Sequence, residues 1–247
     1  MISKSTIKYI QSLQLKKNRD EHNTFIAEGP KVVNELLQQG IFDCDAVYCT
    51  ATWLAANAET IAGTEQNRIF TVEGFELEKI SALSIANQVL AVFYKKPLIT
   101  NVHFENKLTL ILEDIQDPGN LGTIIRTADW FGIENIICSL ASADCYNSKV
   151  VQSTMASLGR VNIFYTNILP FLEEYKNIKK YAALLAGKNI KSFGKINEGF
   201  ILMGNESKGL SKELIEIIDE KITIEKIGQA ESLNVAIATS IILHAIT

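Results

Sequence analysis

Residues 108–132, LTLILEDIQDPGNLGTIIRTADWFG, combine a strand, a turn and a helix in one stretch. The run LTLILEDI has the continuous apolar character of a strand that is covered on both faces, and DPGN is a favourable turn sequence. The segment GTIIRTADWFG that follows has apolar residues at helical spacing. A buried strand that leads through a short turn into a helix is the repeating unit of a parallel α/β sheet.

The same alternation continues to the end of the chain. Apolar strands are expected at residues 135–140, 161–166, 181–187, 200–205 and 221–225, and helices at residues 149–159, 169–177, 211–219 and 232–246. This pattern predicts an α/β domain over residues 106–247, built on a parallel sheet that helices cover on both faces.

The N-terminal part of the chain predicts a second, smaller α/β domain over residues 1–97. Helical patterns occupy residues 7–15, 30–40, 51–60 and 74–83, and strand patterns occupy residues 45–50, 67–72 and 88–95. Pro30 and Gly40 stand where proline and glycine are favoured, at the first turn of a helix and just beyond its end. Residues 98–105, which follow Pro97 and have mixed polarity, are the predicted linker.

The composition indicates a globular chain. Of the 247 residues, 47% are hydrophobic and 21% are charged, which is enough apolar material to bury sizeable cores. No stretch reaches the roughly 20 apolar residues that a membrane helix needs, and the polar N-terminus does not resemble a signal peptide. We therefore expect a cytoplasmic protein that does not contact a membrane. The cysteines, expected to be buried, reduced thiols without a metal role, are Cys44, Cys49, Cys138 and Cys145.

Positive charge is concentrated near the N-terminus, although the formal net charge of the chain is −4. The acidic residues of this stretch are Asp20, Glu21 and Glu28, and the basic ones are Lys4, Lys8, Lys16, Lys17, Arg19 and Lys31. Charge alone allows two interpretations, a solvated helix face or a patch that binds nucleic acid, and it favours the first.

Three segments of the C-terminal part gather glycines, amides and charges directly after predicted strands. They contain Asn120, Gly122 and Arg126, then Gly204, Asn205, Glu206 and Gly209, and finally Ser232 and Asn234. Ligands of open α/β sheets bind at the carboxyl ends of the strands. Each segment alone also fits a structural role, as a turn, a strand end or a helix cap. A Rossmann or P-loop nucleotide site is poorly supported, because neither GxGxxG nor GxxxxGK[ST] occurs.

Taken together and in this order, the three segments resemble the signature motifs of the SpoU-TrmH branch of the SPOUT RNA methyltransferases. The first motif of that family places Asn, Gly and Arg after an acidic-Pro turn, the second is a Gly-Asn-Glu strand end, and the third is a Ser-Leu-Asn-Val segment. The stretch KKNRDEHNTFIAEGPKVVNELL is similar to the family's N-terminal, ribosomal-protein-L30e-like substrate-binding domain. The chain departs from the pattern at Glu225 and Lys226, where many relatives have a proline, and at Ala236, where some have serine.

The resemblance implies a deep trefoil knot in the C-terminal domain and S-adenosylmethionine as the methyl donor, with no metal ion. Loops that hold a cofactor largely through backbone groups favour glycine and other small residues. By carry-over, the cofactor contacts are assigned to Met203, Gly204, Ile224, Ser232 and Leu233. Ile224 and Leu233 would equally suit the core of an α/β sheet.

The resemblance also implies methylation of a ribose 2′-hydroxyl of RNA, with catalysis assigned to Arg126, Asn120, Glu206 and Asn234. The hydroxyl must lose its proton as it attacks, so the site has to stabilise an alkoxide. Arg126 is either the base itself or a group that binds phosphate and stabilises the oxyanion. We favour the second role, because a guanidinium holds its proton tightly. The two asparagines would orient the hydroxyl or Arg126, and Glu206 would fix the loops.

Finally, the resemblance favours RNA binding by the basic N-terminal stretch, through Lys16, Lys17, Arg19 and Lys31. Ribosomal RNA is expected as the substrate ahead of transfer RNA, and a homodimer is expected as the assembly. Two alternatives stay open. One is a catalytically inactive RNA-binding relative, and the other is a nucleotide enzyme that uses DPGNLG to bind phosphate.

Overall fold

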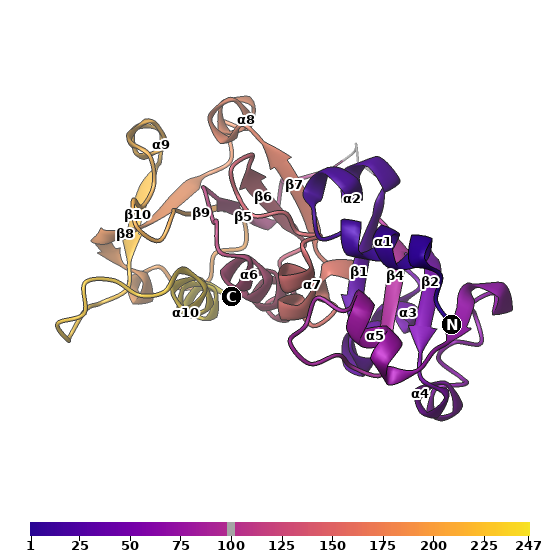
Figure 1. The fold of residues 1–247 in the computed structure, drawn as a ribbon. Helices are drawn as coiled ribbons and strands as arrows, with labels where there is room; N and C mark the ends of the chain where they lie inside the picture. Colours follow the sequence, from indigo (N-terminus) through magenta and orange to yellow (C-terminus); the bar gives the residue numbers. More distant parts are fainter. Residues whose placement is uncertain (98–101) are drawn as a thin grey trace. The chain divides into compact units, whose positions relative to one another are not determined.

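The computed structural model describes residues 1–97 and 102–247, and the chain divides into two compact units (Figure 1). The first unit comprises Met1–Ile99 and Asp144–Gly159, and the second comprises Thr100–Ala143 and Arg160–Thr247. The segment 144–159 therefore groups with the first unit, which the sequence did not indicate. The domain boundaries given above stay a prediction, and residues 98–101 of the predicted linker lie outside the described residues.

The first unit contains a four-stranded mixed sheet. Its strands are β1 (Thr24–Glu28), β2 (Cys44–Cys49), β3 (Ile69–Thr71) and β4 (Val89–Tyr94), in the order β1-β4-β2-β3. Strand β4 is antiparallel to β1 and β2, and β2 is parallel to β3. The helices are α1 (Lys4–Ser12), α2 (Lys16–His22), α3 (Pro30–Gln39), α4 (Ala51–Ala56), α5 (Gly74–Ile80) and α7 (Ser148–Thr154), with 3-10 turns η1 (Gln66–Arg68) and η2 (Ser157–Gly159).

Helix α3 shows how the local sequence determines the ends of a helix. It begins at Pro30, whose missing N–H would have no intrahelical partner at this position. It ends before Gly40, whose backbone is left-handed with a φ of +61°. The predicted helix over this stretch is confirmed.

Two elements of the first unit, α2 and β1, were not predicted. Helix α2 covers the polar stretch KKNRDEH, which lacks an apolar stripe along its sequence. Strand β1 is only five residues long and ends in the carboxylate of Glu28, yet all five residues are buried. Asn23, with a left-handed φ of +54°, separates the two elements. A short strand with a terminal charge carries little sequence signal, because burial here is decided by the neighbouring strand β4.

The second unit is a six-stranded sheet in which every strand pair is parallel, as predicted. Its strands are β5 (Leu108–Leu112), β6 (Asn135–Ser139), β7 (Asn162–Thr166), β8 (Lys180–Asn189), β9 (Gly199–Met203) and β10 (Glu220–Thr223), in the order β10-β8-β9-β5-β6-β7. The helices are α6 (Pro118–Trp130), α8 (Ile168–Glu174), α9 (Lys212–Glu216) and α10 (Val235–Ile246), with a 3-10 turn η3 (Ile190–Ser192).

Helices cover both faces of this sheet. On one face, Ile111 and Leu202 belong to a core cluster with Leu172 of α8 and Leu214 of α9. Successive residues of a strand point to opposite faces, so the neighbours of Ile111 turn to the other side. This leaves the second face to α6 and α10, which pack against each other and bury one apolar side each. β5 lies between β9 and β6, inside the sheet, and its residues are buried on both faces, as its continuous apolar sequence predicts.

The three motif segments follow β5, β9 and β10. Because all strands run in one direction, these segments leave the sheet at the same edge, the one where ligands of open α/β sheets bind. Within residues 1–97 and 102–247, no helix combines the length and the apolar character needed to cross a membrane.

Candidate active site

Three side chains from the three motif segments meet in one hydrogen-bonded cluster. The Nδ2 of Asn120 donates to the Oε1 of Glu206 at 2.8 Å. The Nδ2 of Asn234 donates to the Oδ1 of Asn120 at 2.9 Å. The structure therefore brings together three of the four residues assigned to catalysis, with the Asn120 amide acting as donor to one partner and acceptor to the other.

Helix starts position two of these side chains. Asp117 caps α6, since its carboxylate accepts from the backbone N–H of Asn120 at 2.8 Å, and Pro118 occupies the first helical position. Asn234 caps α10, because its Oδ1 accepts from the N–H groups of Ala236 and Ile237. Asn234, rather than Ser232, is therefore the cap of the last helix. Its Nδ2 group remains available to reach Asn120.

The loop that carries Glu206 closes on itself. Asn205 and Gly209 exchange two backbone hydrogen bonds, at 3.1 and 2.9 Å. A Cβ added at Gly204 would lie 2.3 Å from the carbonyl carbon of Gly209, so only glycine fits at position 204. Gly209 itself has a left-handed φ of +69°. Both glycines are explained by the turn that presents Glu206.

Arg126 does not join the cluster in the isolated chain. It lies on the exposed side of α6, in line with Thr123 and Trp130, which are three and four residues away along the helix. Among the described residues, no hydrogen bond or ion pair to Arg126 is present. The guanidinium is thus free to bind a group that comes from outside the chain.

The residues assigned to the cofactor differ in their exposure and surroundings. Met203 is buried at the end of β9, whereas Ser232 and Leu233 lie in the exposed loop that precedes α10. Ile224, at the start of that loop, lines a cavity of about 460 Å³ together with Ile241 and His244. The remaining assigned residues do not line that cavity.

The loop between β10 and α10 has the chemistry that S-adenosylmethionine requires. In the part of the chain that the structure describes, the backbone N–H groups of residues 225–233 donate to no other backbone carbonyl. Adenine and the amino-acid end of the cofactor are polar groups that such unpaired backbone atoms can bind, and Leu233, 47% exposed, offers an apolar contact for a ring. The residues present therefore fit this cofactor.

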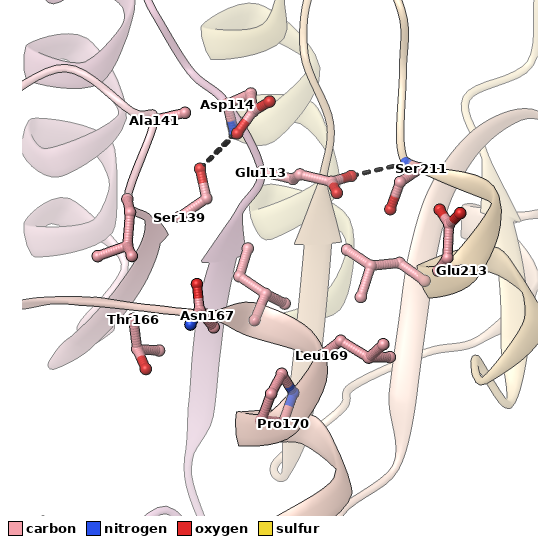
Figure 2. Close-up of a pocket in the computed structure, with 13 residues that line it drawn as sticks. Glu113, Asp114, Ser139, Ala141, Thr166, Asn167, Leu169, Pro170, Ser211 and Glu213 are labelled. Atoms are coloured by element: carbon pink, nitrogen blue, oxygen red, sulfur yellow. Dashed lines mark hydrogen bonds between the residues drawn. The ribbon is translucent and has the colours of Figure 1, made fainter.

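A second cavity, of about 320 Å³, opens at the carboxyl ends of β5, β6 and β7 (Figure 2). Glu113, Asp114 and Ser139 lie along its wall, and Ser211 lies at the start of α9. A 2.7 Å hydrogen bond joins the backbone N–H of Ser211 to the Oε2 of Glu113. The sequence assigned no role to Ser139 or Ser211, because nothing in their local pattern distinguishes them from other serines near a strand or helix end.

The four basic residues assigned to RNA binding all lie in the first unit, but they differ in exposure. Lys16, Lys17 and Lys31 are exposed, whereas Arg19 is 2% exposed. The Arg19 guanidinium pairs with Asp144 at 2.6 Å and donates to the backbone carbonyls of Leu13 and Gln14. These bonds correct the assignment of Arg19 as a phosphate contact, since its donors are taken up inside the unit.

The cysteines form no disulfide, and three of them are buried, with Cys44 partly exposed. Burial raises the pKa of Cys44 to about 12 and that of Cys49 to about 11. Over the described residues, no group of three or more His, Cys, Asp or Glu side chains is arranged to hold a metal ion.

Sequence profiles of two families match the chain. That of the SpoU rRNA Methylase family matches residues 107–244, and that of the MRM3-like substrate binding domain matches residues 4–91. The chain is 29% identical over 243 residues to the 23S rRNA (guanosine(2553)-2′-O)-methyltransferase RlmP of Bacillus subtilis, with 96% of this chain and 94% of that protein covered.

Two solved structures are similar over nearly the whole chain. One is a protein from Porphyromonas gingivalis described as a TrmH-family RNA methyltransferase, with a TM-score of 0.87, 34% identity and coverage of 99% of this chain and 98% of that one. The other is an AdoMet-bound rRNA methyltransferase from Sinorhizobium meliloti, with a TM-score of 0.86, 29% identity and coverage of 99% and 95%.

Proposed function

The chain belongs to the SpoU rRNA Methylase family, and we propose that it transfers a methyl group from S-adenosylmethionine to a ribose 2′-hydroxyl of ribosomal RNA. The observation that carries this proposal is the cluster of Asn120, Glu206 and Asn234, in which the first motif contacts both of the others through Asn120. The relative in Bacillus subtilis, which is aligned along nearly the whole chain, is named as a methyltransferase of 23S rRNA. Large-subunit RNA is therefore the substrate that we favour.

S-adenosylmethionine supplies an electrophilic methyl group when it is bound. Ile224, Leu233 and the unpaired backbone groups of residues 225–233 would hold it. Arg126 would bind a phosphate of the RNA and stabilise the oxyanion that develops on the attacking hydroxyl, while the proton leaves to phosphate or water. Asn120 and Asn234 would orient the hydroxyl, and Glu206 would fix both by accepting from Asn120.

The first unit would bind the RNA. Lys16, Lys17 and Lys31 are exposed cations in the part of the chain that matches a substrate-binding domain. Exposed lysines are suited to phosphate contacts, which supply most of the salt-dependent affinity for nucleic acids. Arg19 would act indirectly, by holding the end of α2 against Asp144.

A homodimer is part of the proposal. Trp130 of α6 is 84% exposed, and Ile237 and Ile241 of α10 are exposed on the outer side of the same helix pair. Large apolar side chains gathered on paired helices are typical of a subunit interface. Arg126 lies on this side of α6, so a second copy would supply or receive the guanidinium that the isolated chain keeps apart from the cluster.

The proposal also includes the knot and the cytoplasmic location. The backbone N–H of Ile196, between β8 and β9, donates to the carbonyl of Ile246 at the end of α10 at 2.8 Å. This bond ties the end of the last helix to the connection between β8 and β9. A ribosomal substrate would place the enzyme in the cytoplasm, where its free thiols would stay reduced.

Mapping of ribose methylation in total RNA tests the proposal. RNA from cells that lack this protein should be missing one 2′-O-methyl group in ribosomal RNA, and the purified protein with S-adenosylmethionine should restore it in vitro. Methylation restored only in transfer RNA would overturn the substrate. A methyl group transferred to a base would overturn the chemistry, and no binding of S-adenosylmethionine would overturn the function as a whole.

A further inference from the structure

We propose that Glu113 and Asp114 are positioning residues, which anchor the loop of residues 204–211 so that Glu206 meets Asn120. The inference rests on the proposed function, because it concerns the rate of methyl transfer. Neither residue belongs to the cluster of Asn120, Glu206 and Asn234. Together they make two hydrogen bonds to the loop, one near each of its ends, and we call this pair of bonds the loop anchor.

The first bond of the loop anchor joins Asp114 to Asn205. The backbone carbonyl of Asp114 accepts from the Nδ2 of Asn205 at 2.9 Å. The same Asn205 side chain accepts, through its Oδ1, from the backbone N–H groups of Ser207 and Lys208 at 2.9 and 3.1 Å. The Asn205 amide thus shapes the turn around Glu206 and connects that turn to the end of β5.

Asp114 can make this bond because its backbone is left-handed, with a φ of +55°. That conformation is uncommon for residues other than glycine, but Asp and Asn adopt it more readily than most. Ser139, at the end of β6, supports it. The Ser139 hydroxyl donates to the Oδ1 of Asp114 at 2.6 Å and accepts from the Asp114 backbone N–H at 2.9 Å, and Figure 2 shows the two side chains facing each other.

The second bond of the loop anchor joins Glu113 to Ser211. The Oε2 of Glu113 accepts from the backbone N–H of Ser211 at 2.7 Å, at the N-terminal end of α9 (Figure 2). The backbone N–H of Glu113 also donates to the carbonyl of Met203 at 2.9 Å, just before the loop begins. Consecutive residues of one strand end therefore hold both sides of the loop.

The loop anchor affects how well the carboxylate of Glu206 is positioned. Its bond to Asn120 lies in an exposed setting, where a single hydrogen bond does little to order a loop. The loop anchor orders the same segment from the side of Glu113 and Asp114, which are partly buried. Loss of the anchor should leave the chemical groups present but reduce the fraction of time that Glu206 and Asn120 are correctly placed.

The test compares Asp114→Ala with the conservative variant Asp114→Asn. Alanine removes the acceptor for Ser139 and disfavours the left-handed backbone, so kcat should fall about tenfold to a hundredfold. The KM for RNA and the Kd for S-adenosylmethionine should stay within about twofold. Asparagine keeps the acceptor and tolerates the backbone conformation, so it should restore most of kcat. Glu213→Ala is the matched control, because it removes another carboxylate from the same cavity and makes neither bond of the loop anchor.

A double-mutant cycle with Glu206→Ala, which removes the acceptor for Asn120, separates positioning from general damage. If Asp114 acts through Glu206, Asp114→Ala should cause less than about a twofold further loss of kcat when Glu206→Ala is already present. Independent multiplication of the two losses, or an unchanged kcat in Asp114→Ala alone, would overturn the proposal.

Hydrogen exchange gives a readout that needs no activity. The amides of Ser207 and Lys208 should exchange faster in Asp114→Ala than in the wild-type chain, while the amides of β5 keep their protection. Unchanged exchange at those two amides would contradict the loop anchor even if the chain proved not to be a methyltransferase. Faster exchange in a chain that binds no S-adenosylmethionine would support the anchor and overturn only the proposed function.

Discussion

The Nδ2 of Asn234 donates to the Oδ1 of Asn120 at 2.9 Å, although 114 positions of the sequence separate the two residues. The Oδ1 of the same Asn234 caps helix α10. The Asn234 side chain thus caps a helix through its oxygen and contacts the proposed catalytic residue Asn120 through its nitrogen, and substitutions can separate these two contacts.

Asn234→Asp should keep the cap and lose the donor to Asn120. We expect the melting temperature to stay near that of the wild-type chain while the rate of methyl transfer falls at least tenfold. Asn234→Ala should remove both hydrogen bonds, with a further loss of stability of about 1 kcal/mol, the usual cost of removing such a cap. Thermal unfolding and single-turnover rates for both variants provide the check. An active Asn234→Asp would show that the amide donor is dispensable.

Arg126→Ala should separate cofactor binding from catalysis. The side chain is exposed and has no partner among the described residues, so its removal should leave the affinity for S-adenosylmethionine near normal. The rate should fall by about two to four orders of magnitude if the guanidinium stabilises the developing oxyanion. Calorimetry and rate measurements test this, with Arg160→Ala as the control for loss of a surface arginine. Wild-type activity in Arg126→Ala would remove this residue from the mechanism.

Alanine substitutions in the basic stretch should have two different effects. Those at Lys16 and Lys17 should affect RNA binding, whereas the one at Arg19 should affect stability. The two lysine changes should weaken RNA binding and lower the dependence of log K on log salt by about 0.7 for each phosphate that is no longer neutralised, without changing stability. Arg19→Ala should instead destabilise the first unit by about 3 to 5 kcal/mol, because it leaves Asp144 without its buried partner. Binding titrations at several salt concentrations and denaturant unfolding distinguish the two outcomes, and Lys212→Ala serves as the control. Equal salt slopes for the wild-type chain and the lysine variants would argue against phosphate binding there.

Ile237→Asp should convert a dimer into a monomer. A charge on the exposed side of α10 would have to lose its hydration at an apolar interface, which is strongly unfavourable. Leu140→Asp places a charge at another exposed apolar residue of the second unit, outside α6 and α10, and should leave the assembly unchanged. Sedimentation equilibrium gives the mass of each species. A wild-type chain that sediments as a monomer would refute the proposed assembly.

Glu28 makes the stability of the first unit depend on pH. Burial raises the pKa of its carboxyl, although the Ser81 hydroxyl and the backbone N–H of Ala82 donate to it. The folded chain therefore binds this proton more tightly than the unfolded chain does. The resulting stabilisation is complete below the ordinary carboxyl range and is lost as the pH rises through the raised value.

Glu28→Gln should consequently raise the melting temperature at pH 8, and this gain should shrink as the pH is lowered towards 4. Glutamine keeps an oxygen that can accept from Ala82, and the Ser81 hydroxyl can rotate to accept instead of donate. The exposed Glu59→Gln is the control and should show no such trend. A gain of the same size at pH 4 and pH 8 would rule out titration of Glu28 as its cause.

The convergence of Asn120, Glu206 and Asn234 could be predicted from the sequence, because each follows a strand of one parallel sheet and those strands end at one edge. The backbone geometry of Asp114 could not be predicted from the sequence. Its left-handed backbone depends on a serine at the end of the next strand, 25 positions away, and aspartate itself gives only a weak preference for that conformation.

The burial of Arg19 was likewise hidden from the sequence. A cation within a basic stretch has the pattern of a solvated or RNA-binding residue, and its partner Asp144 stands 125 positions later. Local charge patterns reveal which ions are present but not which of them will be paired by the fold. Strand β1 was missed for a related reason, since its burial is decided by pairing with β4.

The inclusion of residues 144–159 in the first unit bears on how the chain is made. Synthesis proceeds from the N-terminus, so β5, α6 and β6 leave the ribosome before the segment that supplies α7 and the partner of Arg19. Domains usually fold as units in the order of their synthesis. We therefore expect the first unit to complete its folding only after residue 159 has emerged. By then, part of the second unit's sheet is already outside the exit tunnel.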